Sequence, residues 1–188
     1  MTTNRYQGVT EETPRGDWMQ TYTGRAFYPA DPKPQDIFIE DIAHALSMQC
    51  RYGGHCDDHY SVGEHSFIVS TMVPREDALA ALLHDATEAY LVDVPRPVKV
   101  LLPQYRDLEA TLWAAICARF GLSKTLPDSV HEADNRILLS ERDANMLPPP
   151  MDWGIPDDGT RVKIHLWPAK IAESAFFHRF YELGGGEL

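Results

Sequence analysis

A histidine and an aspartate stand side by side in a segment whose other residues are typical of a buried helix. The pair is His84-Asp85, preceded by Leu79-Ala-Ala-Leu-Leu83 and followed by Ala86 and Ala89. Burying such groups without partners would cost about 1–3 kcal/mol for each neutral group and more for a charge. A His-Asp dipeptide alone is expected by chance. In this setting it requires a fold that supplies partners, either a structural hydrogen-bond pair or a shared ion.

Apolar residues recur at intervals of three and four along most of the chain, which predicts a helical domain. Asp36 is the expected N-cap of the first helix. Ser61, with Glu64 three residues later, predicts a capping box for the second helix. Gly121 is placed to end the fourth helix. The predicted helices cover residues 36–46, 61–73, 75–91, 105–120, 129–146 and 169–183.

The two ends of the chain predict less regular structure. Residues 18–23 and 25–28 flank Gly24 and alternate in polarity, which predicts a small N-terminal hairpin. Residues 161–167 alternate in the same way and predict either a short strand or an extended, irregular C-terminal arm. A chain of 188 residues fits one compact domain. We therefore expect a single all-α domain over residues 1–188, a bundle of about six helices.

The net charge of -11 argues against some partners. Such a surface repels polyanions, so we expect no nucleic-acid polymer, although a small phosphorylated ligand can still bind where cations gather. The chain has 3 cysteines, no Cys-X-X-Cys motif and no basic-then-apolar leader, which predicts a reducing cytoplasm. No apolar run approaches the roughly 20 residues that span a bilayer, so no membrane association is expected.

Other polar residues in apolar surroundings are candidates for the same site. His65 precedes Phe67-Ile-Val69, and Asp134 lies within an apolar helical stretch. With the His-Asp pair they form two imidazoles and two carboxylates, a set that suits one divalent ion among Mn²⁺, Co²⁺, Fe²⁺, Zn²⁺ and Mg²⁺. Glu88 follows His84 by one helical turn and is placed either to deprotonate water or simply at the helix surface.

The ordered set His65, His84-Asp85 and Asp134 resembles the signature of the HD-domain phosphohydrolases. Residues 84–99 closely resemble the bacterial 5′-deoxynucleotidase family and its prophage-borne relatives of the YfdR type. Residues 36–55 and 60–65 also resemble the YfdR-type members, and phage dATP triphosphohydrolases of the DatZ type share the core pattern. The likeness covers roughly residues 20–145 and implies an HD-domain helical bundle with a catalytic core at about residues 36–147.

The resemblance implies roles for individual residues. It makes His65, His84, Asp85 and Asp134 the metal ligands. It makes Glu88 the residue that positions or deprotonates the attacking water, and it places Asp93 near the sugar. Arg51 and Lys99 would contact phosphate oxygens. Tyr52 stands where deoxynucleotidases carry a tryptophan after the arginine, so neither the base preference nor the phosphate-number preference of the family can simply be carried over.

Two features near these residues have more than one interpretation. Gly53-Gly54-His55 either brings backbone amides and an imidazole to a phosphate or forms a flexible turn. Lys99 follows a stiff Pro-X-Pro-Val turn, which would fix its base near the site, although a surface lysine is the ordinary alternative. Glu141-Arg142-Asp143 is interpreted as a set of helix-surface charge pairs.

The activity implied by the resemblance is hydrolysis of the 5′-phosphoester of a 2′-deoxynucleotide. A monophosphate substrate is favoured, which makes the chain a 5′-deoxynucleotidase. The first alternative is a triphosphohydrolase that releases deoxynucleoside and triphosphate, and the second is a non-catalytic nucleotide sensor. Relatives of this kind are homo-oligomers, dimers or hexamers, and belong to nucleotide metabolism in a phage or prophage setting.

Overall fold

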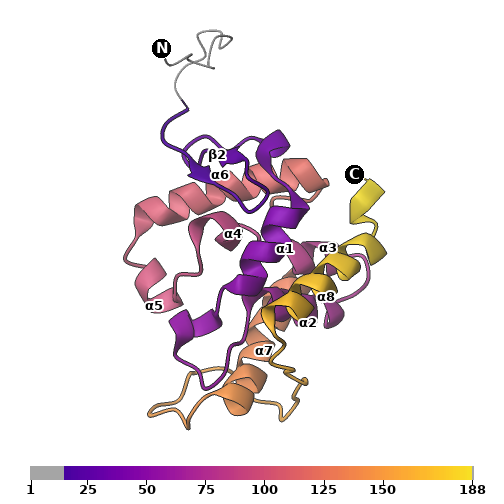
Figure 1. Cartoon of the computed structure of the whole chain (residues 1–188). Helices are drawn as coiled ribbons and strands as arrows, with labels where there is room; N and C mark the ends of the chain where they lie inside the picture. Colours follow the sequence, from indigo (N-terminus) through magenta and orange to yellow (C-terminus); the bar gives the residue numbers. More distant parts are fainter. Residues whose placement is uncertain (1–14, 188) are drawn as a thin grey trace, which may run out of the picture.

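The computed structural model describes residues 15–187 and is mostly helical, which confirms the all-α class (Figure 1). The helices are α1 (Ile39–Met48), α2 (Val62–Thr71), α3 (Ala78–Leu83), α4 (Glu88–Leu91), α5 (Arg96–Lys99), α6 (Pro103–Phe120), α7 (Asp128–Asn145) and α8 (Ala169–Glu182). Three short 3-10 helices are η1 (Pro34–Asp36), η2 (Arg51–Gly54) and η3 (Gly185–Glu187).

The predicted N-terminal hairpin is present. Strand β1 (Met19–Gln20) pairs antiparallel with β2 (Ala26–Phe27), and Gly24 takes a φ of 79° in the connecting turn. Phe27 is fully buried and stacks on Tyr90 at 4.1 Å between ring centroids. The hairpin therefore closes one side of the helical core.

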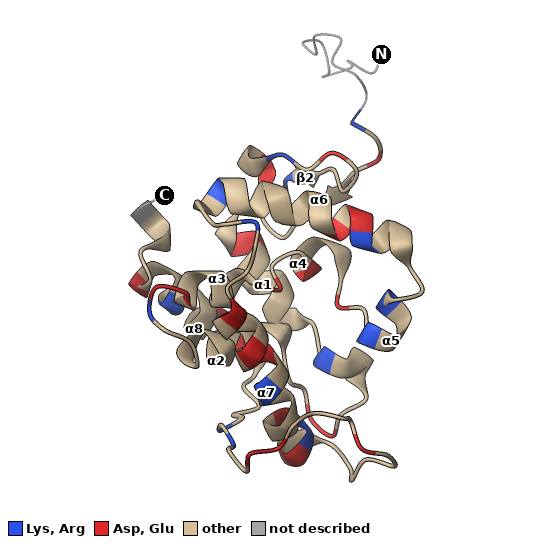
Figure 2. Ribbon diagram, turned by 180° about the vertical axis from the view of Figure 1, so that it is seen from behind, with Lys and Arg blue, Asp and Glu red and all other residues tan. Residues whose placement is uncertain are grey.

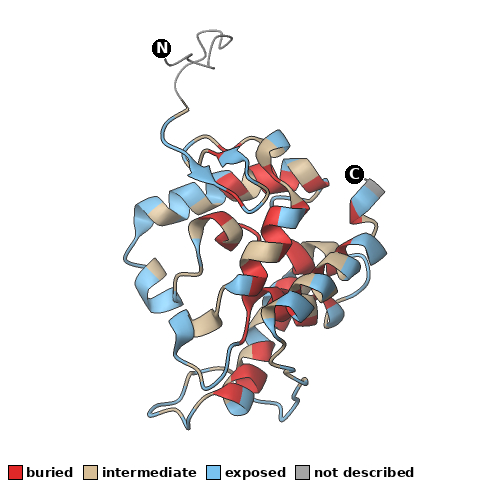
Figure 3. Ribbon diagram, viewed as in Figure 1, coloured by how far each residue is buried: buried red, intermediate tan, exposed pale blue. Residues whose placement is uncertain are grey.

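The main core lies where α1, α2 and α8 pack together, with α3 and α6 completing it (Figure 3). Phe176 and Phe180 stand one turn apart on α8, so both enter this core from the same face. Gly63 lets α1 and α2 approach closely, because a Cβ at this position would lie 2.7 Å from the Ser47 hydroxyl oxygen. Fully buried members from the other helices include Ile42, Leu46, Leu82, Leu83, Leu112 and Ile116.

A smaller core cluster joins α2 to α7, and the C-terminal arm covers it. The arm takes the extended alternative, since residues 161–168 form no strand, and Val162 and Ile164 pack on the cluster. Its anchor is the fully buried carboxylate of Glu64. One oxygen of Glu64 accepts the backbone N–H groups of residues 165 and 166 at 2.7 and 3.0 Å, and the other accepts that of residue 167 at 2.6 Å.

This use of Glu64 corrects half of the predicted capping box. The Ser61 hydroxyl does accept the Glu64 backbone N–H at 3.0 Å, as expected. The Glu64 side chain does not return to the helix start, because its carboxylate holds the arm instead. The prediction of Asp36 as an N-cap is wrong as well. Helix α1 begins at Ile39, and Asp36 ends the η1 turn, where it pairs with Arg15.

The other helix boundaries lie close to prediction. Gly121 ends α6 in the left-handed conformation, with φ of 64°, and α7 and α8 lie within a residue of their expected limits. The predicted helix over residues 75–91 is divided, because residues 84–87 form a turn between α3 and α4. No helix in the described part of the chain combines the length and apolar character needed to cross a bilayer.

Candidate metal centre

Three of the four predicted ligands, His65, His84 and Asp134, form one close group, and the fourth, Asp85, lies beside the two imidazoles. His65 Nε2 lies 3.3 Å from His84 Nε2, 3.4 Å from Asp85 Oδ2 and 3.2 Å from Asp134 Oδ1. His84 Nε2 lies 3.3 Å from Asp85 Oδ2 and 3.8 Å from Asp134 Oδ1. Ligand atoms held at about 2.1 Å by one ion lie about 3 to 3.5 Å from one another. His65, His84 and Asp134 form a group that could hold a metal ion.

Three separate elements deliver these ligands. His65 lies in α2, Asp134 lies in α7, and His84-Asp85 lies in the turn between α3 and α4. In that turn the Ala86 and Glu88 backbone N–H groups donate to carbonyls three residues back, both at 2.9 Å. The chain is therefore wound more tightly here than in an α-helix. The winding brings the adjacent His84 and Asp85 to the same point.

Hydrogen bonds at Nδ1 fix the orientation of both imidazoles. His65 Nδ1 lies 2.7 Å from Glu141 Oε1, and His84 Nδ1 lies 2.7 Å from the Ala81 carbonyl oxygen. Both partners are acceptors, so the proton of each neutral ring resides on Nδ1. Two Nε2 lone pairs then face each other at 3.3 Å. This arrangement requires a cation or a proton between them, and the donor set fits a divalent metal.

The pKa values of the histidines and of Asp134 also indicate a positive charge between the side chains of the centre. Burial alone would lower the pKa of His84, but Asp85 and Asp134 outweigh it and raise that pKa to about 9. Burial would likewise lower the pKa of His65, but the surrounding carboxylates leave it raised. Burial would raise the pKa of Asp134, yet the two imidazoles lower it well below the usual range. Without a metal, the centre therefore retains protons on its imidazoles.

The interpretation of Glu141 as a surface residue is wrong. Its carboxylate is fully buried and accepts from Tyr60 at 2.9 Å, from Tyr52 and from Arg51 Nη2 at 3.2 Å, besides contacting His65. Burial would raise the pKa of Glu141, but Arg51 and His65 lower it to about 2. Glu141 is thus an ionised anchor behind the His65 ligand.

The sequence did contain a signal for this role. Glu141 follows Asp134 by seven residues, two turns along the same face of α7. Its neighbours Arg142 and Asp143 do form the expected charge pair, with nitrogen and oxygen 2.7 Å apart, although the Arg142 side chain is half-buried. The two neighbouring charges made the buried one look like part of a surface patch.

Glu88 lies beside the ligands in a poorly solvated position. It is 5% exposed, its Oε1 lies 3.6 Å from Lys99 Nζ, and its buried Oε2 has no hydrogen-bond partner. Burial, followed by the charges of Asp85 and Asp93, raises the pKa of Glu88 well above its ordinary value. The surface alternative is excluded. The structure instead presents a buried carboxyl group that is able to hold a proton.

The turn that carries Glu88 and Asp93 is supported by Gln49, a residue that the sequence interpretation missed. Gln49 Nε2 donates to the Glu88 carbonyl at 2.9 Å, and its Oε1 accepts the Asp93 backbone N–H at 3.0 Å. Between them, Val92 adopts a φ of 64°, unusual for a β-branched residue. Burial is the main cause of the raised pKa of Asp93, which the nearby Arg51 opposes.

The predicted substrate residues are only partly gathered at the centre. Arg51 reaches it, with Nη1 3.7 Å from Asp85 Oδ2, and Tyr52 contacts the ligand shell through Glu141. Lys99 pairs with Glu109 at 2.8 Å as well as facing Glu88. His55 is exposed at the end of η2, and among the described residues no contact joins its imidazole to the four ligands.

Charge is unevenly distributed around this region. Viewed from behind, α5 carries basic positions, whereas α7 carries mostly acidic positions together with two arginines (Figure 2). The basic residues of α5 are Arg96 and Lys99, which are half-buried or exposed. Positively charged side chains are therefore present on the side of the centre where Lys99 lies, despite the negative net charge of the chain.

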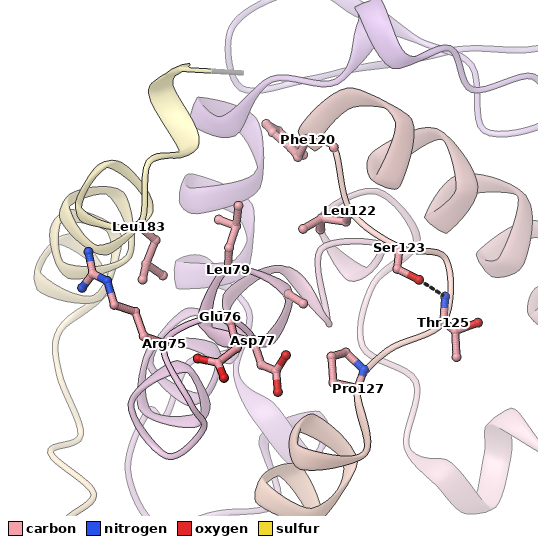
Figure 4. A pocket seen from close by; sticks show the side chains of 12 residues that line it. Arg75, Glu76, Asp77, Leu79, Phe120, Leu122, Ser123, Thr125, Pro127 and Leu183 are labelled. Carbon is pink, nitrogen blue, oxygen red and sulfur yellow. Dashed lines mark hydrogen bonds between the residues drawn. The ribbon is translucent and has the colours of Figure 1, made fainter.

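A hollow of about 700 Å³ lies elsewhere, between the start of α3, the α6–α7 connection and the end of α8 (Figure 4). Leu79, Leu122 and Leu183 form its apolar part, and Arg75, Glu76 and Asp77 lie along one side. None of the ten predicted site residues lines it. The hollow is thus separate from the metal centre.

Bacterial proteins similar to this chain include the uncharacterized protein YfdR of Escherichia coli (strain K12). It is 40% identical over 151 residues, which cover 80% of this chain and 77% of that protein. An uncharacterized protein of Rhodobacter capsulatus is 41% identical over 126 residues, 62% of this chain and 64% of that protein. No protein-family model matches the chain. Both relatives are described as uncharacterized, so neither description carries an activity to this chain.

Proposed function

This chain belongs to the family of the Escherichia coli protein YfdR, and from that premise we propose that it is a metal-dependent phosphohydrolase of the HD-domain type. The reaction is hydrolysis of the 5′-phosphoester of a 2′-deoxynucleotide. The observation that carries the proposal is the group of two oriented imidazole nitrogens and the Asp134 carboxylate, with Asp85 3.3–3.4 Å from both imidazoles and a buried acid nearby. Such a set suits hydrolysis at phosphorus.

His65, His84, Asp85 and Asp134 would hold one divalent ion, Co²⁺, Mn²⁺, Zn²⁺, Fe²⁺ or Mg²⁺. When bound, this ion would supply Lewis acidity that polarises a phosphoryl oxygen and lowers the pKa of water. Glu141 keeps His65 in the tautomer that offers Nε2, and the Ala81 carbonyl does the same for His84. The protein therefore presents its ligands already oriented.

Glu88 is the residue that takes the proton of the attacking water. Its buried position and raised pKa suit a group that accepts a proton during the reaction and holds it afterwards. Lys99 Nζ at 3.6 Å limits that shift and keeps the carboxylate form available. The buried oxygen without a hydrogen-bond partner is free to receive the proton.

Phosphate binding is assigned to Arg51 and Lys99. Each already lies against carboxylates of the site, Arg51 against Asp85 and Lys99 against Glu88. Their charges offset negative charge that develops on the phosphoryl oxygens. Asp93, held through its backbone by Gln49, is proposed to contact the sugar. His55 and Tyr52 are the weaker candidates, because His55 is exposed and the Tyr52 hydroxyl is already bonded to Glu141.

A turnover screen tests this function. Deoxynucleoside monophosphates, ribonucleoside monophosphates and deoxynucleoside triphosphates would each be incubated with Mn²⁺, Co²⁺ or Mg²⁺, and the products identified. We expect phosphate release from deoxynucleoside monophosphates. If dATP releases free triphosphate and the monophosphates are not hydrolysed, the substrate is a deoxynucleoside triphosphate instead of a monophosphate.

Glu88→Ala separates catalysis from binding alone. We expect turnover to fall by about 10²–10⁴-fold while metal content is retained. Glu76→Ala, an exposed acid at the start of α3, is the control and should retain full activity. Tight nucleotide binding without turnover in the unaltered protein would indicate a sensor.

Location and assembly are also part of the proposal. A reducing cytoplasm is proposed from the cysteine pattern, and a dimer or hexamer is proposed from the resemblance. Cell fractionation and light scattering of the purified chain would test them separately.

A further inference from the structure

Two cysteines stand at the two ends of the loop that carries Arg51 and Tyr52. Cys50 and Cys56 lie with their sulfur atoms 3.5 Å apart, and both are half-buried, so small oxidants can reach them. The third cysteine, Cys117, is buried in α6 and donates to the Ser123 carbonyl instead. The chain therefore contains one paired and one isolated thiol environment.

The backbone on both sides of this pair is fixed. The backbone of Cys50 pairs with that of Ser61 in an isolated antiparallel β-bridge, and the Arg51 N–H donates to the Tyr60 carbonyl at 2.8 Å. On the other side, the backbone N–H groups of Asp57 and Asp58 donate to Asn145 at 3.0 and 2.8 Å. The two sulfur atoms are thus held as neighbours by backbone contacts at both ends of the loop.

Within the loop, Glu141 holds the side chains of Arg51 and Tyr52, whereas the two glycines that follow have no side chains to restrain them. Tyr52, Gly53 and Gly54 all adopt positive φ, at 58°, 61° and 80°. The backbone of the loop is closed by a hydrogen bond from residue 55 to the Tyr52 carbonyl at 3.1 Å. A bond between the sulfur atoms would need them to approach from 3.5 Å to about 2.05 Å, a change within the reach of side-chain rotation.

We propose that Cys50 and Cys56 are a modification site, at which a reversible disulfide ties together the two ends of the loop that carries Arg51 and Tyr52. A metal site at these thiols is not supported, because the one group of three or more donor residues found among the described residues is that of His65, His84 and Asp134. The proposal goes beyond the proposed phosphohydrolase function and does not require it.

The oxidant is a low-molecular-weight disulfide such as oxidised glutathione. One cysteine attacks it as the thiolate, forms a mixed disulfide and releases one reduced glutathione. The second cysteine then attacks the protein sulfur of the mixed disulfide and releases the other reduced glutathione. Two protein thiols are oxidised, one small disulfide is reduced, and the two protons pass to the released thiols.

The reaction is expected to take minutes to hours. Burial, followed by the neighbouring Cys50, raises the pKa of Cys56 to about 11, and its sulfur donates to the Asp58 carbonyl at 3.2 Å. This group is therefore a thiol rather than a thiolate at neutral pH, and only the thiolate attacks.

Thiol counting and peptide mass analysis of the full chain test the proposal. The protein would be incubated with oxidised glutathione, then denatured, its free thiols counted and its peptides analysed without reduction. We expect the 3 thiols to fall to one, with a loss of two hydrogens and a cross-link between the Cys50 and Cys56 peptides. Reduced glutathione should restore all of them.

Three serine variants serve as matched controls. Cys117→Ser should form the same cross-link, whereas Cys50→Ser and Cys56→Ser should each gain glutathione and form none. Hydrogen exchange of residues 51–55 should slow on oxidation only where the cross-link forms. The proposal is overturned if the unaltered chain keeps 3 thiols or stops at a glutathione adduct. These results are independent of whether any nucleotide is hydrolysed.

Discussion

Glu141 Oε1 and His65 Nδ1 lie 2.7 Å apart with both side chains fully buried. The contact joins α7 to α2 directly behind the metal centre. It fixes which nitrogen of His65 faces the other ligands, and it does so with an ionised partner, because the pKa of Glu141 is lowered to about 2. The metal affinity of the centre should therefore depend on a residue that is not itself a ligand.

The first prediction concerns this contact. Glu141→Gln should weaken metal binding by about 10–100-fold, because the amide supplies a weaker acceptor to His65 and leaves Arg51 less well neutralised. Metal competition titration would measure the change. Asp143→Asn, two residues along the same helix but exposed, is the control. Equal affinities in both variants would contradict the role of Glu141.

Metal binding should release protons. The pKa of His84 is raised to about 9, so the metal-free imidazole is protonated at pH 7, whereas a metal ligand must be neutral. Affinity should thus rise as the pH increases toward 9, and the contribution of His84 to proton release should vanish above that pH. Calorimetry in buffers with different ionisation enthalpies would measure the release. A heat of binding that is independent of the buffer at pH 7 would count against the prediction.

Lys99→Met should move the acid limb of the activity profile to higher pH. Lys99 lowers the pKa of Glu88, so its removal raises that pKa further and leaves less carboxylate at neutral pH. The loss of kcat/KM should therefore be larger at pH 6 than at pH 8. Lys163→Met, at an exposed position in the C-terminal arm, should leave the profile in place. A loss of the same size at every pH would mean that Lys99 acts on phosphate alone.

Glu64→Gln should destabilise the fold by about 2–4 kcal/mol, because an amide cannot accept all the backbone N–H groups that the buried carboxylate now binds. Urea denaturation would measure the loss, and proteolysis should become faster within residues 161–168. Glu76→Gln, at an exposed position, is the control and should change the free energy of unfolding by no more than about 0.5 kcal/mol. An arm that remains protected in Glu64→Gln would show that other contacts hold it.

The sequence was most informative where burial produces a repeating pattern. Helices α6, α7 and α8 follow regular apolar spacing and a Gly121 stop, and their limits were predicted closely. The grouping of His65, His84 and Asp134 was also expected, because each is a polar residue in apolar surroundings. Residues of this kind need a partner, and together they supply one another.

The sequence-based predictions are wrong where one side chain contacts a residue that is distant in sequence. The tight winding over residues 84–87 leaves no periodic signature, so a continuous helix was predicted. Glu64 and Glu141 both occur in local patterns that have a simple local explanation, a capping box and a surface ion pair. Their actual partners lie 76 or more residues away in sequence. Local spacing can place Glu141 on the same helix face as Asp134, but it does not specify the distant partner.

The Glu64 anchor has a consequence for the order of assembly during synthesis. Glu64 is adjacent to the predicted ligand His65, yet the N–H groups that bind its carboxylate belong to residues 165–167, about a hundred residues later in the sequence. A nascent chain that has exposed only residues 1–160 outside the ribosome still lacks them. The carboxylate beside the candidate ligand His65 therefore gains its partners only after all four candidate ligands have been synthesised.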